Sequence, residues 1–256
     1  MALTRMATPA RRASKPDETG LRDLIIDNIR YAADNAPRSL QRHIGPSQVG
    51  TPCDRQLAYR LEGTPESRSF MDPWPSIVGT AVHAWLADAM ETHNQLLISK
   101  GLPARWHLEK RVDVGFGLTG SCDCFDEVTG TVLDWKILGN TQYTKYVKEG
   151  PSEEYRVQAH CYALGYARAG FDVKRVAIGF FGRAKTLNDL YIWSEPFDPN
   201  IAIAALARLK ETNEKLAAGM TPLEFPASPG AVCFFCPFKR GGDDESQCRY
   251  CPEEPN

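Results

Sequence analysis

Apolar side chains recur along the chain with the spacing of amphipathic helices in some segments and alternate in others. Leu21, Ile25 and Ile29, for example, would share one face of a helix. Residues 106–114 instead alternate between apolar and polar side chains, as in a strand. The patterns predict helices over residues 17–35, 77–100, 152–166 and 199–216, and strands over residues 106–114, 118–136 (a hairpin), 173–183 and 190–194. This order predicts an α/β fold with a central mixed sheet flanked by helices.

The predicted hairpin carries the most informative polar residues. A glycine-containing turn at residues 127–131 would join its two strands. Asp134 and Lys136 lie two residues apart on the second strand, so they project from the same face, and Asp123 on the first strand approaches them if the hairpin pairs as the turn suggests. Carboxylates are ligands for Mg²⁺ or Mn²⁺, and an ammonium group beside them can position or activate a water molecule. A surface hairpin with an ordinary Asp/Lys pair is the alternative.

Two predicted helices carry further candidates. His83 lies on the helix over residues 77–100, whose core-facing side is predicted to include Trp85 and Leu86. A lone histidine there is a candidate site residue or a satisfied polar group near the core. Gln158 and Tyr162 are four residues apart on a later helix and therefore share one face.

Composition describes an ordinary globular protein rather than a nucleic-acid-binding chain of high charge. The 256 residues are 43% hydrophobic and 24% charged, with a net charge of −2, so any surface for nucleic acid must be local. Residues 1–16 hold only basic charges and are expected to be a disordered arm, with a transit peptide as the alternative, and residues 17–256 are expected to form one domain. No apolar run is long enough to span a bilayer and no secretory signal is evident, so we expect a cytoplasmic protein without membrane contact.

The eight cysteines need an explanation other than disulfides in a reducing compartment. Two Cys-x-x-Cys units, at residues 233–236 and 248–251, close the chain. All four thiolates could hold a structural zinc ion, which leaves Cys53 unexplained. Alternatively, Cys53 joins Cys233, Cys236 and one later cysteine in a metal cluster. Cys122 and Cys124 flank Asp123 on the opposite strand face, which indicates core positions.

The motifs together resemble a known family. Gly120-x-x-Asp123 followed by Asp134-x-Lys136 resembles the active-site signature of the PD-(D/E)xK nuclease superfamily. Gly-Thr-x-x-His83 and Gln158-x-x-x-Tyr162 resemble further motifs of its RecB-like members, in the same order. Cys53 and the distant C-terminal cysteines resemble the iron–sulfur nucleases of the AddB and CRISPR-adaptation type, so the resemblance covers residues 46–251.

This resemblance implies a PD-(D/E)xK nuclease core and a Mg²⁺- or Mn²⁺-dependent DNA exonuclease. The substrate would be single-stranded DNA, in recombination, repair or CRISPR adaptation. The implied catalytic residues are Asp123, Asp134 and Lys136. The metal would be held by His83, Asp123, Asp134 and the carbonyl of Trp135, and Gln158 and Tyr162 would bind substrate. Glu109 would be a further acid of the site; alternatively, its side chain lies on a solvated face.

The resemblance also implies a [4Fe–4S] cluster that joins the two ends of the domain, within residues 46–62 and 226–256. Its ligands would be Cys53, Cys233, Cys236 and Cys248, with Cys251 as the alternative to Cys248. Two other functions stay open: a catalytically silent DNA-binding or scaffold subunit with a nuclease fold, and a nuclease that acts only with a helicase, recombination or CRISPR-adaptation partner.

Overall fold

A computed structural model describes residues 18–36, 44–66, 72–228, 236–238 and 248. The chain divides into two compact units, residues 1–41 and 42–256. In the first unit, the helix predicted from the apolar spacing is present as α1, Glu18–Asp34, and Leu21 and Ile25 on its apolar stripe are exposed. The basic arm predicted over residues 1–16 lies outside the described residues.

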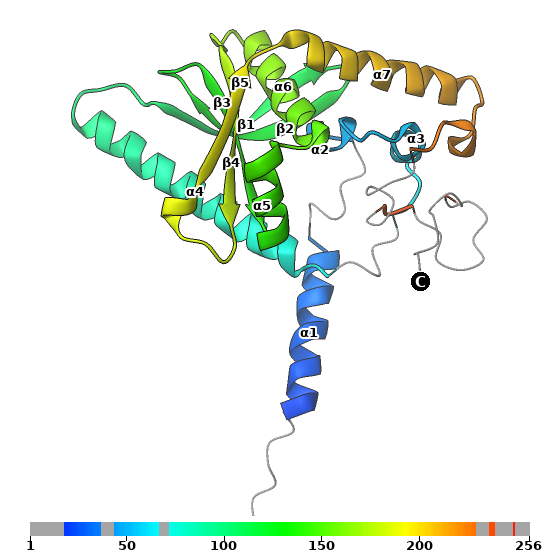
Figure 1. Cartoon of the computed structure of the whole chain (residues 1–256), viewed down its shortest axis with the longest axis horizontal. Coiled ribbons are helices and arrows are strands. Elements are labelled where there is room, and N and C mark those ends of the chain that lie inside the picture. Colours follow the sequence, from blue (N-terminus) through cyan, green and yellow to red (C-terminus); the bar gives the residue numbers. More distant parts are fainter. Residues whose placement is uncertain (1–17, 37–43, 67–71, 229–235, 239–247, 249–256) are drawn as a thin grey trace, which may run out of the picture. The chain divides into compact units, whose positions relative to one another are not determined.

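The second unit contains the sheet and the helices that cover it (Figure 1). Its α-helices are α2 (Pro46–Val49), α3 (Asp54–Glu62), α4 (Trp74–Ser99), α5 (Asn140–Glu149), α6 (Glu153–Arg168) and α7 (Pro199–Ala217), with short 3₁₀ helices η1 (Leu187–Asp189) and η2 (Pro222–Glu224). Its strands are β1 (Trp106–Gly115), β2 (Leu118–Asp126), β3 (Thr131–Leu138), β4 (Arg175–Gly182) and β5 (Tyr191–Pro196).

The five strands form one mixed sheet in the order β1-β2-β3-β4-β5. All neighbours are antiparallel except β3 and β4, which are parallel because the chain returns through α5 and α6 between them. The α/β fold with a mixed sheet flanked by helices is therefore confirmed.

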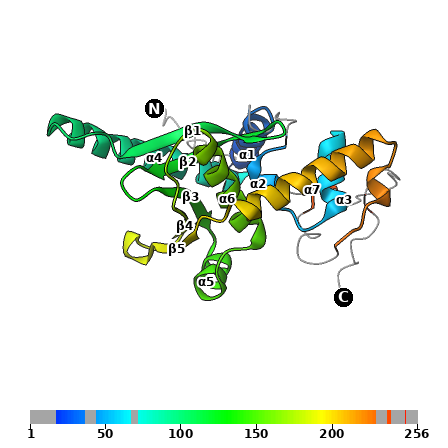
Figure 2. The ribbon, with the colours of Figure 1, turned by 90° about the horizontal axis from the view of Figure 1, so that it is seen from above.

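Helices α4 and α6 pack on opposite faces of the sheet. On β3, Val132 belongs to the core that packs against α6, whereas Trp135 packs against Leu86 of α4. Positions 132 and 135 differ by an odd number, so their side chains leave opposite faces of the strand. Helix α7 packs beside α6 and α3 and extends the helical layer (Figure 2).

One detail of the predicted core is wrong. Trp85 is predicted to face the core, but 63% of its surface is exposed, because only the stripe through Leu86 reaches the sheet. Residues 140–149, over which the sequence patterns predict no helix or strand, form α5. Tyr143 is buried and Tyr146 packs on Phe180.

Candidate functional site

The site lies where strands β2 and β3 separate. Their pairing runs only from Cys124 to Asp126, although β2 continues to pair with β1 beyond this point. The carboxylate of Asp123 occupies the place of the next backbone partner: its Oδ2 accepts a hydrogen bond from the backbone N–H of Trp135 at 2.7 Å. The separation of the strands leaves the other carboxylate oxygen, Oδ1, available to groups from α4.

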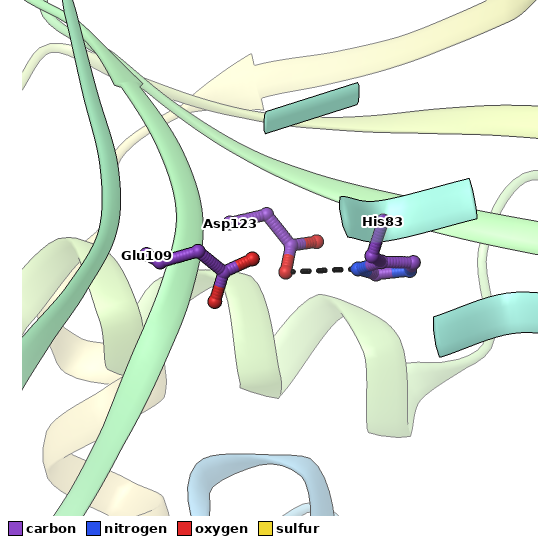
Figure 3. Close-up of side chains that lie close together, drawn as sticks. All are labelled: His83, Glu109 and Asp123. Carbon is purple, nitrogen blue, oxygen red and sulfur yellow. Dashed lines mark hydrogen bonds and ion pairs between the residues drawn. The ribbon is translucent and has the colours of Figure 1, made fainter. Parts of the chain in front are cut away.

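Three potential metal ligands converge on this opening (Figure 3). Nδ1 of His83 on α4 lies 3.1 Å from Oδ1 of Asp123. Glu109 lies on β1 opposite Asp123, between two paired positions of the β1–β2 ladder. Its φ is positive, at 47°, so its side chain does not follow the regular up-and-down alternation of the strand. One ligand atom each from His83, Glu109 and Asp123 lie within 4.8 Å of one another.

Asp134 and Lys136 form a second, more buried part of the site. Lys136 Nζ lies 2.5 Å from Asp134 Oδ2 and donates to Gln158 Oε1 at 2.9 Å. Gln158 Nε2 in turn donates to Asp134 Oδ1 at 3.0 Å. The ring of Tyr155 lies under the ammonium group, with 4.5 Å between Nζ and the ring centroid. Helix α6 thus fixes the positions of both charged groups of the Asp-x-Lys motif.

Burial and neighbouring charges together shift the pKa values of His83 and Asp134. Burial alone would lower the pKa of His83, but the hydrogen bond and charge of Asp123, followed by the charge of Asp134, raise it above its usual value. Burial raises the pKa of Asp134 to about 6, although the adjacent Lys136 acts in the opposite direction. The negative charge of Asp123 adds to the increase. The site therefore concentrates more negative charge than its own lysine balances.

This surplus of carboxylate suits a divalent cation. Carboxylate oxygens are the protein ligands that Mg²⁺ and Mn²⁺ prefer, and Glu109 and Asp123 supply them from two strands beside the imidazole of His83. Asp134 Oδ2 is buried and makes no hydrogen bond of good geometry in the described part of the chain, despite the nearby ammonium group. The residues present thus fit the expected metal.

Gly120 and Tyr162 shape the surroundings of these groups. A Cβ at Gly120 would lie 2.7 Å from Pro46 Cδ and 3.2 Å from Tyr162 Cε1, so only glycine lets β2 approach both α2 and α6 here. Tyr162 is 6% exposed and packs in the core next to Gln158, one turn earlier on α6. Its expected contact with substrate stays a prediction, as does the part assigned to the Trp135 carbonyl.

Sequence reasoning missed Tyr155. Its ring contacts the Lys136 ammonium group and its position three residues before Gln158 places both side chains on one face of α6. The spacing was therefore visible in the sequence, but tyrosine near a helix start is too common to single out without the contact.

The predicted cysteine-cluster region is partly described. Cys53 precedes the first turn of α3, and the side chains of that turn reach the C-terminal cysteines: Arg55 Nη1 lies 3.8 Å from Cys248 Sγ, and Gln56 Nε2 lies 3.7 Å from Cys236 Sγ. The three cysteines are buried. Cys233 and Cys251 lie outside the described residues. The structure therefore brings the N-terminal and C-terminal parts of the predicted region together.

Comparisons with known proteins find distant structural neighbours. No curated protein matches the sequence. Among solved structures, the alkaline exonuclease LHK-Exo from Laribacter hongkongensis is 13% identical, with a TM-score of 0.45 over 70% of this chain and 89% of that one. A phage-related exonuclease from Haemophilus somnus 129PT is 14% identical, with a TM-score of 0.41 over 76% and 89%. Within the described residues no helix is both long and apolar enough to cross a membrane.

A family model gives the decisive match. The model of the PD-(D/E)XK nuclease superfamily matches residues 99–241, more than half of the chain. The match contains the hairpin with Asp123, Asp134 and Lys136 as well as Gln158 on α6. The chain belongs to the PD-(D/E)XK nuclease superfamily.

Proposed function

We propose that the protein is a Mg²⁺- or Mn²⁺-dependent exonuclease that hydrolyses phosphodiester bonds of single-stranded DNA. The observation that carries the proposal is the meeting of two groups of side chains: the His83–Glu109–Asp123 ligand set and the Asp134–Lys136–Gln158 cluster. The intact pair of acids and lysine distinguishes this proposal from a silent nuclease-fold subunit, in which one of these groups would be expected to be lost.

Each group has a separate task. His83, Glu109, Asp123 and Asp134 would hold the metal, which would offset negative charge on the scissile phosphate. Lys136 stabilises the negative charge that develops on the phosphate oxygens, because its ammonium group is fixed by Asp134 and Gln158 before substrate arrives. Gln158 acts by holding Lys136 and Asp134 in one arrangement.

The test compares the wild-type protein with Lys136→Ala on end-labelled single-stranded DNA in the presence of Mn²⁺. Wild type should shorten the strand progressively, the labelled end gives the polarity, and Lys136→Ala should be inactive while still folded. Lys174→Ala is a matched control, because this lysine pairs with Asp172 on the surface. Equal activity of the two variants would refute the role of Lys136, and inactivity of the wild type would favour the scaffold subunit or the need for a partner.

We also propose that Cys53, Cys233, Cys236 and Cys248 hold a [4Fe–4S] cluster, as in the RecB-like iron–sulfur nucleases that the motifs resemble. The burial of Cys236 and Cys248 beside the helix that Cys53 precedes supports it. Such a cluster would join residues far apart in the chain and stabilise the folded domain.

Metal content distinguishes this cluster from a zinc site. Anaerobically purified protein should be brown and contain about four iron atoms per chain, and Cys53→Ser should lose most of the iron. The zinc alternative uses Cys251 instead of Cys53, so it predicts stoichiometric zinc that Cys53→Ser retains. Cys161→Ser is the control, because this buried cysteine lies in the core beside α7 rather than near Cys236.

A further inference from the structure

The tip of the β1–β2 hairpin presents an aromatic ring on an unfavourable backbone. Phe116 and Gly117 form a two-residue turn between Gly115 and Leu118, and their φ angles are 53° and 75°. Two successive positive φ angles are typical of type I′ turns, which favour Asn or Gly because a larger side chain crowds the backbone there. The ring is 65% exposed. Neither the turn geometry nor burial therefore favours phenylalanine at this position.

The turn that carries the ring is firmly held. Asp113 Oδ1 accepts a hydrogen bond from the Gly115 N–H at 2.8 Å, and Arg168 of α6 donates to the carbonyl of Val114. A Cβ at Gly115 would lie 2.1 Å from Arg168 Nη1, so the guanidinium group lies directly against the backbone. The exposed ring is thus presented by a fixed support.

One cation lies beside the ring and another lies against the turn. Lys210 of α7 places its ammonium group 5.9 Å from the ring centroid of Phe116, and Arg168 lies against the backbone at Gly115. Of the nearby acids, Asp113 is engaged by the turn and Glu214 lies 3.6 Å from Lys210. An exposed ring beside cations suits a nucleic-acid base stacked on the ring with its phosphates near the cations.

We propose that Phe116 is a base-stacking contact for the single-stranded substrate, with Lys210 and Arg168 near its phosphates. This inference rests on the proposed nuclease function. Asp123 lies five positions after Leu118 on β2, which is about 17 Å at the rise of a strand. The stacked base therefore belongs to a nucleotide away from the scissile phosphate. The contact holds the strand during cleavage and does not take part in the chemistry.

Phe116→Asn separates this role from a structural one. Asn suits the turn, so the variant should melt at a higher temperature than the wild type. Its affinity for a long oligodeoxythymidylate, measured by fluorescence anisotropy in EDTA so that no cleavage occurs, should fall by about 5- to 150-fold, the range for one stacked base. Phe116→Trp keeps a ring and should retain the affinity. Val128→Asn, in the turn at the other end of β2 and 69% exposed, is the matched control.

A base-free nucleotide placed at successive positions of the oligonucleotide locates the contact. The affinity of the wild type should fall when the base-free nucleotide is at one particular position, whereas the affinity of Phe116→Asn should not change there. Both proteins should cleave with equal efficiency a short oligonucleotide that cannot reach the tip. Unchanged affinity of Phe116→Asn, or equal sensitivity of both proteins to every base-free position, would overturn the stacking contact while leaving the nuclease intact. Failure of the wild type to bind or cleave DNA would overturn the proposed function itself.

Discussion

Asp134→Asn should stabilise the metal-free protein at alkaline pH. Asp134 is 3% exposed, and burial raises its pKa from the usual 3.8 to about 6. The folded state therefore binds its proton more tightly than the unfolded state, so the stability associated with this group is fully present below pH 4 and is lost as the pH rises to about 6. The rise of this pKa from 3.8 to about 6 corresponds to a free energy on the order of 3 kcal/mol.

The amide removes this charge while keeping the shape of the side chain. With the oxygen of the new amide toward Gln158 Nε2, the hydrogen bond between the two amides and the hydrogen bond from Lys136 to Gln158 Oε1 are both kept, and only the ion pair with Lys136 is lost. We therefore expect Asp134→Asn to exceed the wild type by about 3 kcal/mol at pH 8 and by close to nothing at pH 4. The same substitution should abolish cleavage, because the site loses a metal ligand.

Urea denaturation in EDTA, followed by circular dichroism at several pH values, measures the effect. Asp172→Asn is the control, because this carboxylate is exposed and should change stability little at any pH. A pH-independent gain by Asp134→Asn would show that packing, not the charge, is responsible. No gain at pH 8 would refute the assignment of a buried, destabilising carboxylate.

Two further substitutions test the geometry. Glu109→Gln should weaken Mn²⁺ binding by at least about 10-fold in calorimetry, because it removes the charge of one of the four proposed ligands, whereas Glu153→Gln on the exposed start of α6 should have no effect. Gly165→Ala should lower thermal stability by about 1–2 kcal/mol, because its Cβ would lie 2.7 Å from Val112 Cγ2. Gly79→Ala has no neighbour within 4 Å in α4 and should instead gain stability from helix propensity; equal effects of the two alanines would contradict the close packing of α6 on β1.

Local periodicity determined much of this protein. The two-residue period of a strand places Asp134 and Lys136 on one face, and the four-residue spacing of a helix places Gln158 next to Tyr162. Both relations hold whatever the rest of the chain does, so they could be predicted together with the mixed sheet and its flanking helices.

Only the tertiary structure decided which residues from distant elements meet. His83 and Asp123 come together because β2 separates from β3 beneath α4, and Glu109 joins them because its positive φ interrupts the alternation of β1. The exposure of the Phe116 ring likewise depends on the type of turn that carries it. The exposure of Trp85 depends on which side of α4 the sheet covers. Such features arise from strand separation, backbone irregularity and packing angles, which depend on contacts between distant segments and leave no periodic signal in the sequence.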